Sequence, residues 1–72
     1  MHKIYIIDIE TGETLDTICG LIIPQAGSKL FIQKFENRVD QYIVKDAEHH
    51  INKIASEMYT NVRVFNLGVS YD

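Results

Sequence analysis

The chain has 72 residues, a formal net charge of -3, 46% hydrophobic residues and a single cysteine. This length predicts one domain over residues 1–72 with a small core, and the hydrophobic fraction is too high for a disordered chain. The negative charge, with its scattered Lys and Arg, argues against binding to nucleic acid or to an anionic membrane, and a lone cysteine excludes an internal disulfide.

The start of the sequence lacks a basic stretch followed by a long apolar one, as a signal peptide would have. No apolar run approaches the roughly 20 residues that a membrane span requires. We therefore expect a cytoplasmic protein.

The first predicted element is a β-hairpin. Residues 3–9 are rich in isoleucine and predict a strand, Glu10-Thr11-Gly12 predicts a three-residue turn with a glycine bulge, and residues 13–23 predict the returning strand. The expected cross-strand pairs are Ile9 with Glu13, Ile7 with Leu15, and Tyr5 with Thr17.

This hairpin has two largely apolar faces. One carries Tyr5, Ile7, Ile9, Leu15, Cys19 and Leu21, and the alternation makes it the better core candidate. The other carries Ile4, Ile6, Asp8, Thr14, Asp16, Ile18 and Ile22. This second face predicts a docking surface for a partner or for a second copy of the chain, unless a barrel closes over both faces.

A tight loop is expected after the second strand. Pro24 has no N–H for a ladder, and Gly27 lies where a turn often needs positive φ. Residues 29–35 then predict a third strand, and residues 36–40 are polar enough for a turn.

Two more strands are predicted, over residues 41–45, with Tyr42 and Val44 inward, and over residues 62–67. The segment 46–59 between them leaves two possibilities open. Its apolar residues fall at helical spacing behind a possible cap at Asp46, which favours a short amphipathic helix. Alternatively, the fourth strand continues through Ile51 and a hairpin loop lies near Ser56.

A Pro-x-x-Gly loop followed by an apolar strand and by Tyr-x-Val-x-x-Ala-x-His resembles small phage- and prophage-encoded β-barrel proteins. The matching residues are Pro24, Gly27, Tyr42, Val44, Ala47 and His49. The resemblance implies a mainly β fold, a five-stranded antiparallel and partly open barrel (SH3-like), and a binding or accessory role for a mobile element. The longer segment 52–61 departs from the pattern and leaves room for one short helix between the fourth and fifth strands.

The sequence Asp8-Ile9-Glu10-Thr11-Gly12 after an apolar run resembles the first motif of DEDD exonucleases, in which acids hold two divalent metals. That chemistry needs four converging acids. This chain is much shorter than such a domain and has no middle motif, so an ordinary hairpin turn is the favoured interpretation.

The adjacent histidines His49 and His50 do not predict a metal site. Consecutive strand residues point to opposite faces, and neither histidine has a second ligand at helical spacing. We expect no metal and no cofactor. We expect His49 to be a structural residue, partly buried and hydrogen-bonded, and His50 to face solvent.

Four acids, Asp8, Glu10, Glu13 and Asp16, gather at one end of the first hairpin. They predict either a solvated turn or an acidic patch for a basic partner. Together with Ile4, Ile6, Ile18 and Ile22 they form the predicted binding surface. We therefore expect a non-enzymatic protein-interaction module, a phage-related accessory protein or inhibitor whose partner is a host or phage protein, or a second copy of the chain in a homodimer. The alternatives are a nucleic-acid-binding barrel that stacks bases on Tyr5, Phe31, Phe35 or Tyr42, and a metal-dependent nuclease fragment.

Overall fold

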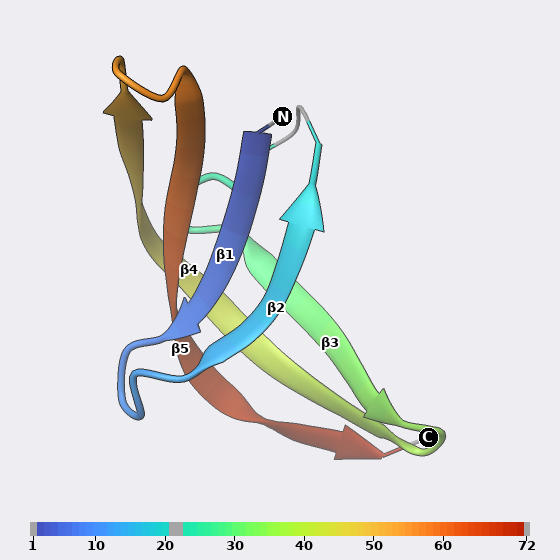
Figure 1. Cartoon of the computed structure of the whole chain (residues 1–72). Helices are drawn as coiled ribbons and strands as arrows, with labels where there is room; N and C mark the ends of the chain where they lie inside the picture. Colours follow the sequence, from blue (N-terminus) through green and yellow to red (C-terminus); the bar gives the residue numbers. More distant parts are fainter. Residues whose placement is uncertain (1, 21–22, 72) are drawn as a thin grey trace.

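The computed structural model describes residues 2–20 and 23–71. These residues form one sheet whose strands are β1 (His2–Asp8), β2 (Thr14–Cys19), β3 (Lys29–Phe35), β4 (Arg38–Asn52) and β5 (Glu57–Tyr71). The strand order is β2-β1-β5-β4-β3, and the sheet curls into a half-barrel with β2 and β3 at its two edges (Figure 1).

The sheet is mixed, because β1 runs parallel to β5 while the other neighbouring pairs are antiparallel. The expectation of a small five-stranded, barrel-like β fold is confirmed. The expectation of an all-antiparallel sheet is wrong, since two strands at opposite ends of the chain pair in parallel, which the local sequence pattern does not encode.

The short helix that segment 46–59 favoured is absent from the described residues. β4 instead continues to Asn52, a turn spans residues 53–56, and β5 begins at Glu57. The strand-and-loop alternative is confirmed. Long-range pairing with β5 outweighs the helical spacing, and the apolar residues of the segment do not share one buried face: Ala47 packs against the core while Ile54 is exposed.

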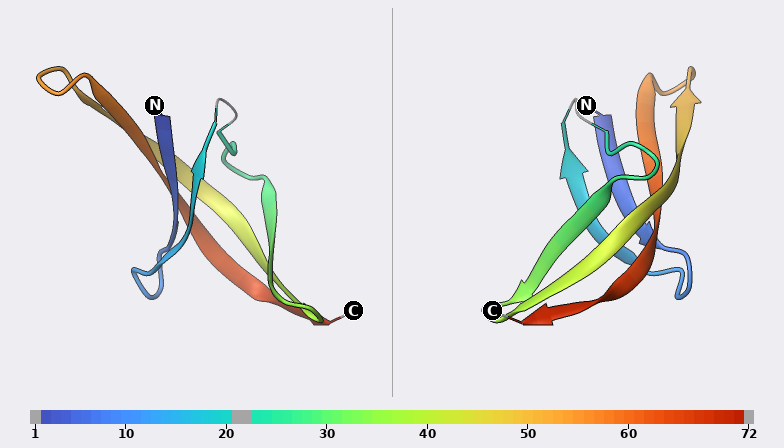
Figure 2. Two further views of the ribbon diagram at one scale, coloured as in Figure 1. Left: turned by 45° about the vertical axis from the view of Figure 1, so that its right-hand side comes forward. Right: turned by 180° about the vertical axis from the view of Figure 1, so that it is seen from behind.

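Irregularities in the ladders give the sheet its curl. The register between β4 and β5 shifts at Lys45, which has no partner between the pairs Val44–Val64 and Asp46–Arg63. Such a bulge bends and twists its strand. The far half of the hairpin therefore leaves the body of the half-barrel, as Figure 2 shows.

The core lies on the inner, concave face of the sheet. Its buried hydrophobic residues are Ile4, Ile6, Tyr42, Val44, Val62 and Val64. Tyr42 and Val44 point inward, as the alternation predicts. The predicted core face of the first hairpin is wrong, because Ile4 and Ile6 are buried there instead of Tyr5 and Ile7. The reason is the parallel register of β1 with β5, which places Ile4 beside Thr60 and Ile6 beside Val62.

The first turn is one residue longer than predicted. Asp8 N donates to Glu13 O at 2.9 Å, so Ile9 lies inside the loop, and Gly12 has a φ of 75°. The pair Tyr5–Thr17 forms as expected, whereas Ile7 pairs with Thr14. Leu15 is thus an extra residue, and this bulge lets it pack against the core.

The loop before β3 is hydrogen-bonded to β4. Gly27, with a φ of 87°, donates its N–H to Val44 O at 2.9 Å, and Val44 N donates to Ser28 O at the same distance. Pro24 is half-buried. The loop residues thus place the start of β3 against the middle of β4.

A buried carboxylate, Asp40, lies near the start of β4. Asp40 is 1% exposed, and its two oxygens lie 3.0 Å from Arg38 Nε and 3.0 Å from Lys34 Nζ. Tyr42 OH also donates to Asp40 Oδ2 at 3.4 Å. Hydrogen bonds from Arg38 and Lys34 hold the pKa of the Asp40 carboxyl below its ordinary value.

Candidate binding surface

The predicted docking face is part of the core. Ile4 and Ile6 are buried, and Asp8 is 7% exposed. A surface that has to meet a partner or a second copy of the chain cannot consist of these side chains, so the structure contradicts this part of the predicted binding site. The sheet closes over that face, and the opposite face of β1 is the more exposed one.

The remaining predicted binding residues are dispersed. Glu10, Glu13 and Asp16 are exposed around the first turn, Ile18 is 38% exposed on the edge strand β2, and Ile22 lies outside the described residues. Cys19, expected on the core face, is exposed.

The nuclease-like motif has a local structural explanation. Asp8 Oδ1 accepts a hydrogen bond from Glu10 N at 2.9 Å, which fixes the turn. A metal site there would need further acids, but Asp46 is paired with Arg63. Within residues 2–20 and 23–71 no group of three or more His, Cys, Asp or Glu is placed to hold a metal ion.

A different surface emerges at the end of the β4–β5 hairpin. We call residues 51–58 the hairpin tip. Ile54 is 99% exposed, and Ile51 and Met58 are 67% and 47% exposed. Single exposed apolar residues are common in proteins, but three large ones on one projecting hairpin form a patch.

The turn that carries Ile54 is held in place by its own hydrogen bonds. Asn52 Oδ1 accepts from Ile54 N at 3.1 Å and from Ala55 N at 3.2 Å. Ser56 adopts the left-handed conformation, with a φ of 53°, and returns the chain into β5. The tip thus presents Ile54 in a defined position.

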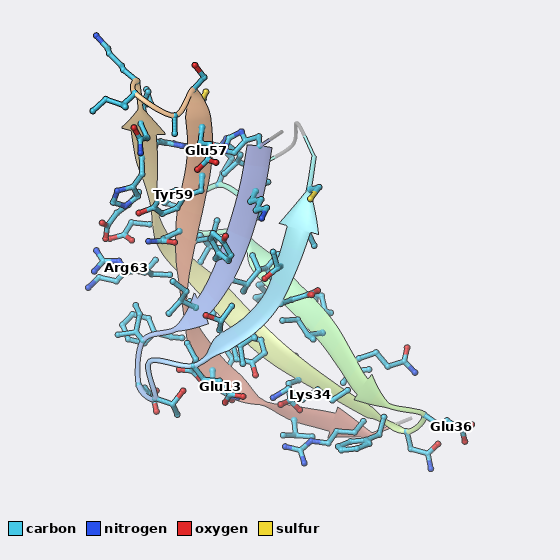
Figure 3. The ribbon with its side chains drawn as sticks, viewed as in Figure 1. Glu13, Lys34, Glu36, Glu57, Tyr59 and Arg63 are labelled. Atoms are coloured by element: carbon cyan, nitrogen blue, oxygen red, sulfur yellow. The ribbon has the colours of Figure 1, made fainter. Side chains whose placement is uncertain are left out.

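Three rings lie on the outer face beside the tip. His50 stacks on Tyr59, with ring centroids 4.5 Å apart and planes 7° apart. Tyr5 meets Tyr59 edge to face, with centroids 5.8 Å apart. We call Tyr5, His50 and Tyr59 the ring cluster; the label of Tyr59 in Figure 3 marks its place below the tip.

A shallow cavity of about 220 Å³ adjoins the ring cluster and is lined by Lys3, Tyr5, Glu57, Met58 and Tyr59. Apolar, aromatic and charged groups therefore meet at one place. Interfaces combine these elements, with Tyr and Met enriched among their central residues.

Ion pairs border the ring cluster on the side away from the tip. Arg63 Nε donates to Asp46 Oδ1 at 2.7 Å and lies 3.1 Å from Glu48 Oε1. The Arg63 hydrogen bond holds the pKa of the Asp46 carboxyl below its ordinary value. One guanidinium faces two carboxylates, so the outer face offers no unbalanced basic patch there.

The inner side of the same hairpin holds a histidine pair. Thr60 Oγ1 is shared between His2 Nε2, at 2.6 Å, and His49 Nδ1, at 3.0 Å. Thr60 is fully buried while His49 is exposed, so His49 is hydrogen-bonded as expected but less buried than expected. A single hydroxyl serves both rings, since it has one hydrogen to donate and lone pairs that accept.

Sequence reasoning did not identify the hairpin tip as a surface because it left segment 46–59 open between a helix and a hairpin loop. The signal that pointed to the loop was Asn52 followed by Ile54, Ala55 and Ser56, since an asparagine that caps its own turn is typical of a hairpin loop.

Comparison with protein-family models, with curated proteins and with solved structures finds no match to this chain. The described residues contain no helix of the length and apolarity that would cross a membrane.

Proposed function

We propose that the chain is a non-enzymatic protein-interaction module that docks on a partner through the hairpin-tip surface, defined as the hairpin tip together with the ring cluster. The observation that carries the proposal is the 99% exposure of Ile54 at the end of a hydrogen-bonded turn. We take the partner to be a protein with an apolar pocket that receives Ile54.

The energetics favour such docking. Burying an isoleucine or methionine side chain contributes about 1.5–3 kcal/mol, and the tip offers three such side chains. Because Asn52 already fixes the turn, less conformational freedom is lost on binding. The ring cluster supplies rigid aromatic area on the outer face of the hairpin, whereas Ile51 and Met58, which pair across the ladder, lie on the other face.

The resemblance to small phage- and prophage-encoded barrels supports a role as an accessory protein or inhibitor that acts on a host protein. It directs the search for the partner to a bacterial lysate. A compact module of this kind acts by occupying a surface of its target.

The test compares two single substitutions of exposed apolar residues. Ile54→Lys places a charge at the tip, and Phe31→Lys places the same charge on β3, where Phe31 is 62% exposed. The wild-type chain is used to capture a partner from the lysate. The captured protein is then titrated by calorimetry with the wild type and with each variant. We expect Ile54→Lys to weaken binding by about a hundredfold, within the range for a central interface residue, and Phe31→Lys to leave it unchanged. Equal affinities would remove the tip from the binding site.

A second candidate function is binding of single-stranded nucleic acid on the ring cluster. The stacked rings of His50 and Tyr59 favour it, since bases stack on such platforms. Tyr42 is buried and so cannot take part, and the net charge of -3 opposes it. Salt-sensitive binding of a labelled oligonucleotide, lost in Tyr59→Ala, would replace the protein-binding proposal.

A further inference from the structure

We propose that the open side of the half-barrel, between β2 and β3, binds an extended basic segment of a partner protein, which adds to the free edge of β2 as a new strand. This site is separate from the hairpin-tip surface. It does not depend on what binds there.

The opening contains a groove of about 430 Å³. Glu13, Leu15 and Asp16 line one wall, and Ile32, Gln33 and Lys34 line the other. Leu15 and Ile32 are half-buried and pack against the core, so the floor of the groove is the edge of the hydrophobic core. Figure 3 shows Glu13 and Lys34 at the lower end of this opening.

β2 is the least covered strand of the sheet. Leu15 is half-buried, and the other residues from Thr14 to Cys19 are exposed. Ile18 remains 38% exposed although its partner across the ladder is the fully buried Ile4. β2 pairs with β1 on one side only, so its other edge presents N–H and C=O groups to an incoming strand. A strand in the groove would cover both Ile18 and Leu15.

The charged residues that line the groove determine which charge on the incoming strand is favoured. Lys34 is already paired with Asp40 at 3.0 Å, which leaves Glu13 and Asp16 to give the groove a negative balance. A basic segment is therefore favoured. The lysines Lys29 and Lys34 lie on β3, whereas β2 has no basic residue, so a basic segment pairs with β2 in preference to β3.

The same charges disfavour a second copy of the chain at this edge. Antiparallel pairing of β2 with β2 from another copy would bring together two acidic edges, each with Asp16 on the strand, Glu13 just before it and no basic residue to balance them. Like charges that face one another across strands are destabilising. We therefore take the occupant to be a basic segment of a different protein.

Three labelled peptides of the length of β2 test the site with the wild-type chain. The first alternates lysine with valine, the second alternates glutamate with valine, and the third is the lysine peptide with a central proline. Fluorescence anisotropy at about 0.15 M salt, where the Debye length is about 8 Å, gives the affinities, and NMR amide shifts locate the contact. We expect the first peptide to bind at least about tenfold more tightly than the other two, because only it combines complementary charge with strand geometry. The largest shifts are expected in β2.

Charge reversal supplies the matched variants. Glu13→Lys with Asp16→Lys should weaken binding of the lysine peptide by about tenfold or more and improve binding of the glutamate peptide. Glu36→Lys, in the exposed turn between β3 and β4 (Figure 3), should change neither affinity by more than about twofold. Equal binding of the two charged peptides to the wild type, or shifts confined to β3 or to the hairpin tip, would overturn the proposal. So would the absence of saturable binding.

Discussion

The side-chain oxygen Oδ1 of Asn52 lies 3.1 Å from the backbone nitrogen of Ile54, and this hydrogen bond fixes the turn that carries Ile54, whose side chain is 99% exposed. The same oxygen also accepts from Ala55 N. An asparagine at the end of β4 therefore connects the local structure of the turn to the surface proposed to bind a partner.

Removing this side chain should loosen the turn without unfolding the sheet. We expect Asn52→Ala to lower the free energy of unfolding by about 0.5–1.5 kcal/mol, the range for an intramolecular hydrogen bond. The amide protons of Ile54 and Ala55 should exchange with solvent measurably faster, as followed by NMR. Asn37→Ala, in the exposed turn between β3 and β4, is the control and should leave these two amides unchanged. Unaltered exchange in Asn52→Ala would show that the turn does not depend on this bond.

The buried carboxylate of Asp40 should make the fold sensitive to acid. Its pKa is lowered from 3.8 by hydrogen bonds from Arg38 and then from Lys34. Because the folded pKa lies below the unfolded one, the unfolded chain takes up the proton first. The stabilisation is complete above about pH 4 and is lost as the pH falls further. The melting temperature of the wild type should therefore drop on acidification below that value.

Two variants identify the group responsible. Asp40→Asn should be less stable than the wild type at neutral pH and should show a shallower loss of stability in acid. Glu36→Gln changes an exposed turn carboxylate and should behave as the wild type does. If Asp40→Asn keeps the full acid dependence, Asp46, whose pKa is lowered by Arg63, becomes the group to test.

The hydroxyl shared by the two histidines should contribute measurably to stability. Thr60→Val keeps the shape of the side chain but leaves His2 Nε2 and His49 Nδ1 without this partner, and we expect a loss of about 1–3 kcal/mol. Thr60→Ser keeps the hydroxyl and loses one buried methyl group, for about 1 kcal/mol. Urea unfolding of both variants compares them. If Thr60→Val is no less stable than Thr60→Ser, the histidines gain nothing from the hydroxyl.

The local features of the fold were predictable where a turn residue or an alternation defines them. Residues 29–35 form the predicted third strand, and Gly27 has the positive φ that its loop suggested. What the sequence did not reveal was the parallel neighbour of β1. Without knowledge of that neighbour, Tyr5 and Ile7 were as good candidates for the core face as Ile4 and Ile6. The register shift between β1 and β2 at the extra residue Leu15 was also not visible in the pattern.

The candidate site was less predictable than the fold, for a related reason. Ile51, Ile54 and Met58 have the spacing of an amphipathic helix, and only the long ladder between β4 and β5 turns them into a projecting tip. His50 and Tyr59 lie nine positions apart in the sequence and stack only because the ladder pairs them. Contacts of this kind depend on register, which a hydrophobic pattern alone leaves open.

Gly27 offers a test of backbone strain that is free of steric contacts. A Cβ atom at this position would meet no atom within 4 Å, so only its φ of 87° opposes a side chain. We expect Gly27→Ala to lower the free energy of unfolding by about 1–3 kcal/mol. Gly20→Ala is the matched control, because Gly20 is equally open and does not have a positive φ. Thermal unfolding compares the two, and an equal effect would mean that the loop adapts to the side chain.

The last prediction separates core from edge within the first hairpin. Ile6 is 3% exposed and lies beside Val62, whereas Ile18 is 38% exposed on the free strand β2. Ile6→Lys buries an unpaired charge, which costs several kcal/mol. The total stability of a native domain is about 5–15 kcal/mol, and the small core of this chain favours the lower end. We therefore expect Ile6→Lys to be unfolded.

Ile18→Lys should remain folded, since its ammonium group reaches water, and should lose no more than about 1 kcal/mol. Circular dichroism and the dispersion of NMR amide signals check both variants, and light scattering gives their oligomeric state. If Ile6→Lys folds and differs from the wild type only in self-association, Ile6 belongs to an interface between copies of the chain. An unfolded Ile18→Lys would place Ile18 in the core and remove it from the β2 edge proposed to bind a basic strand.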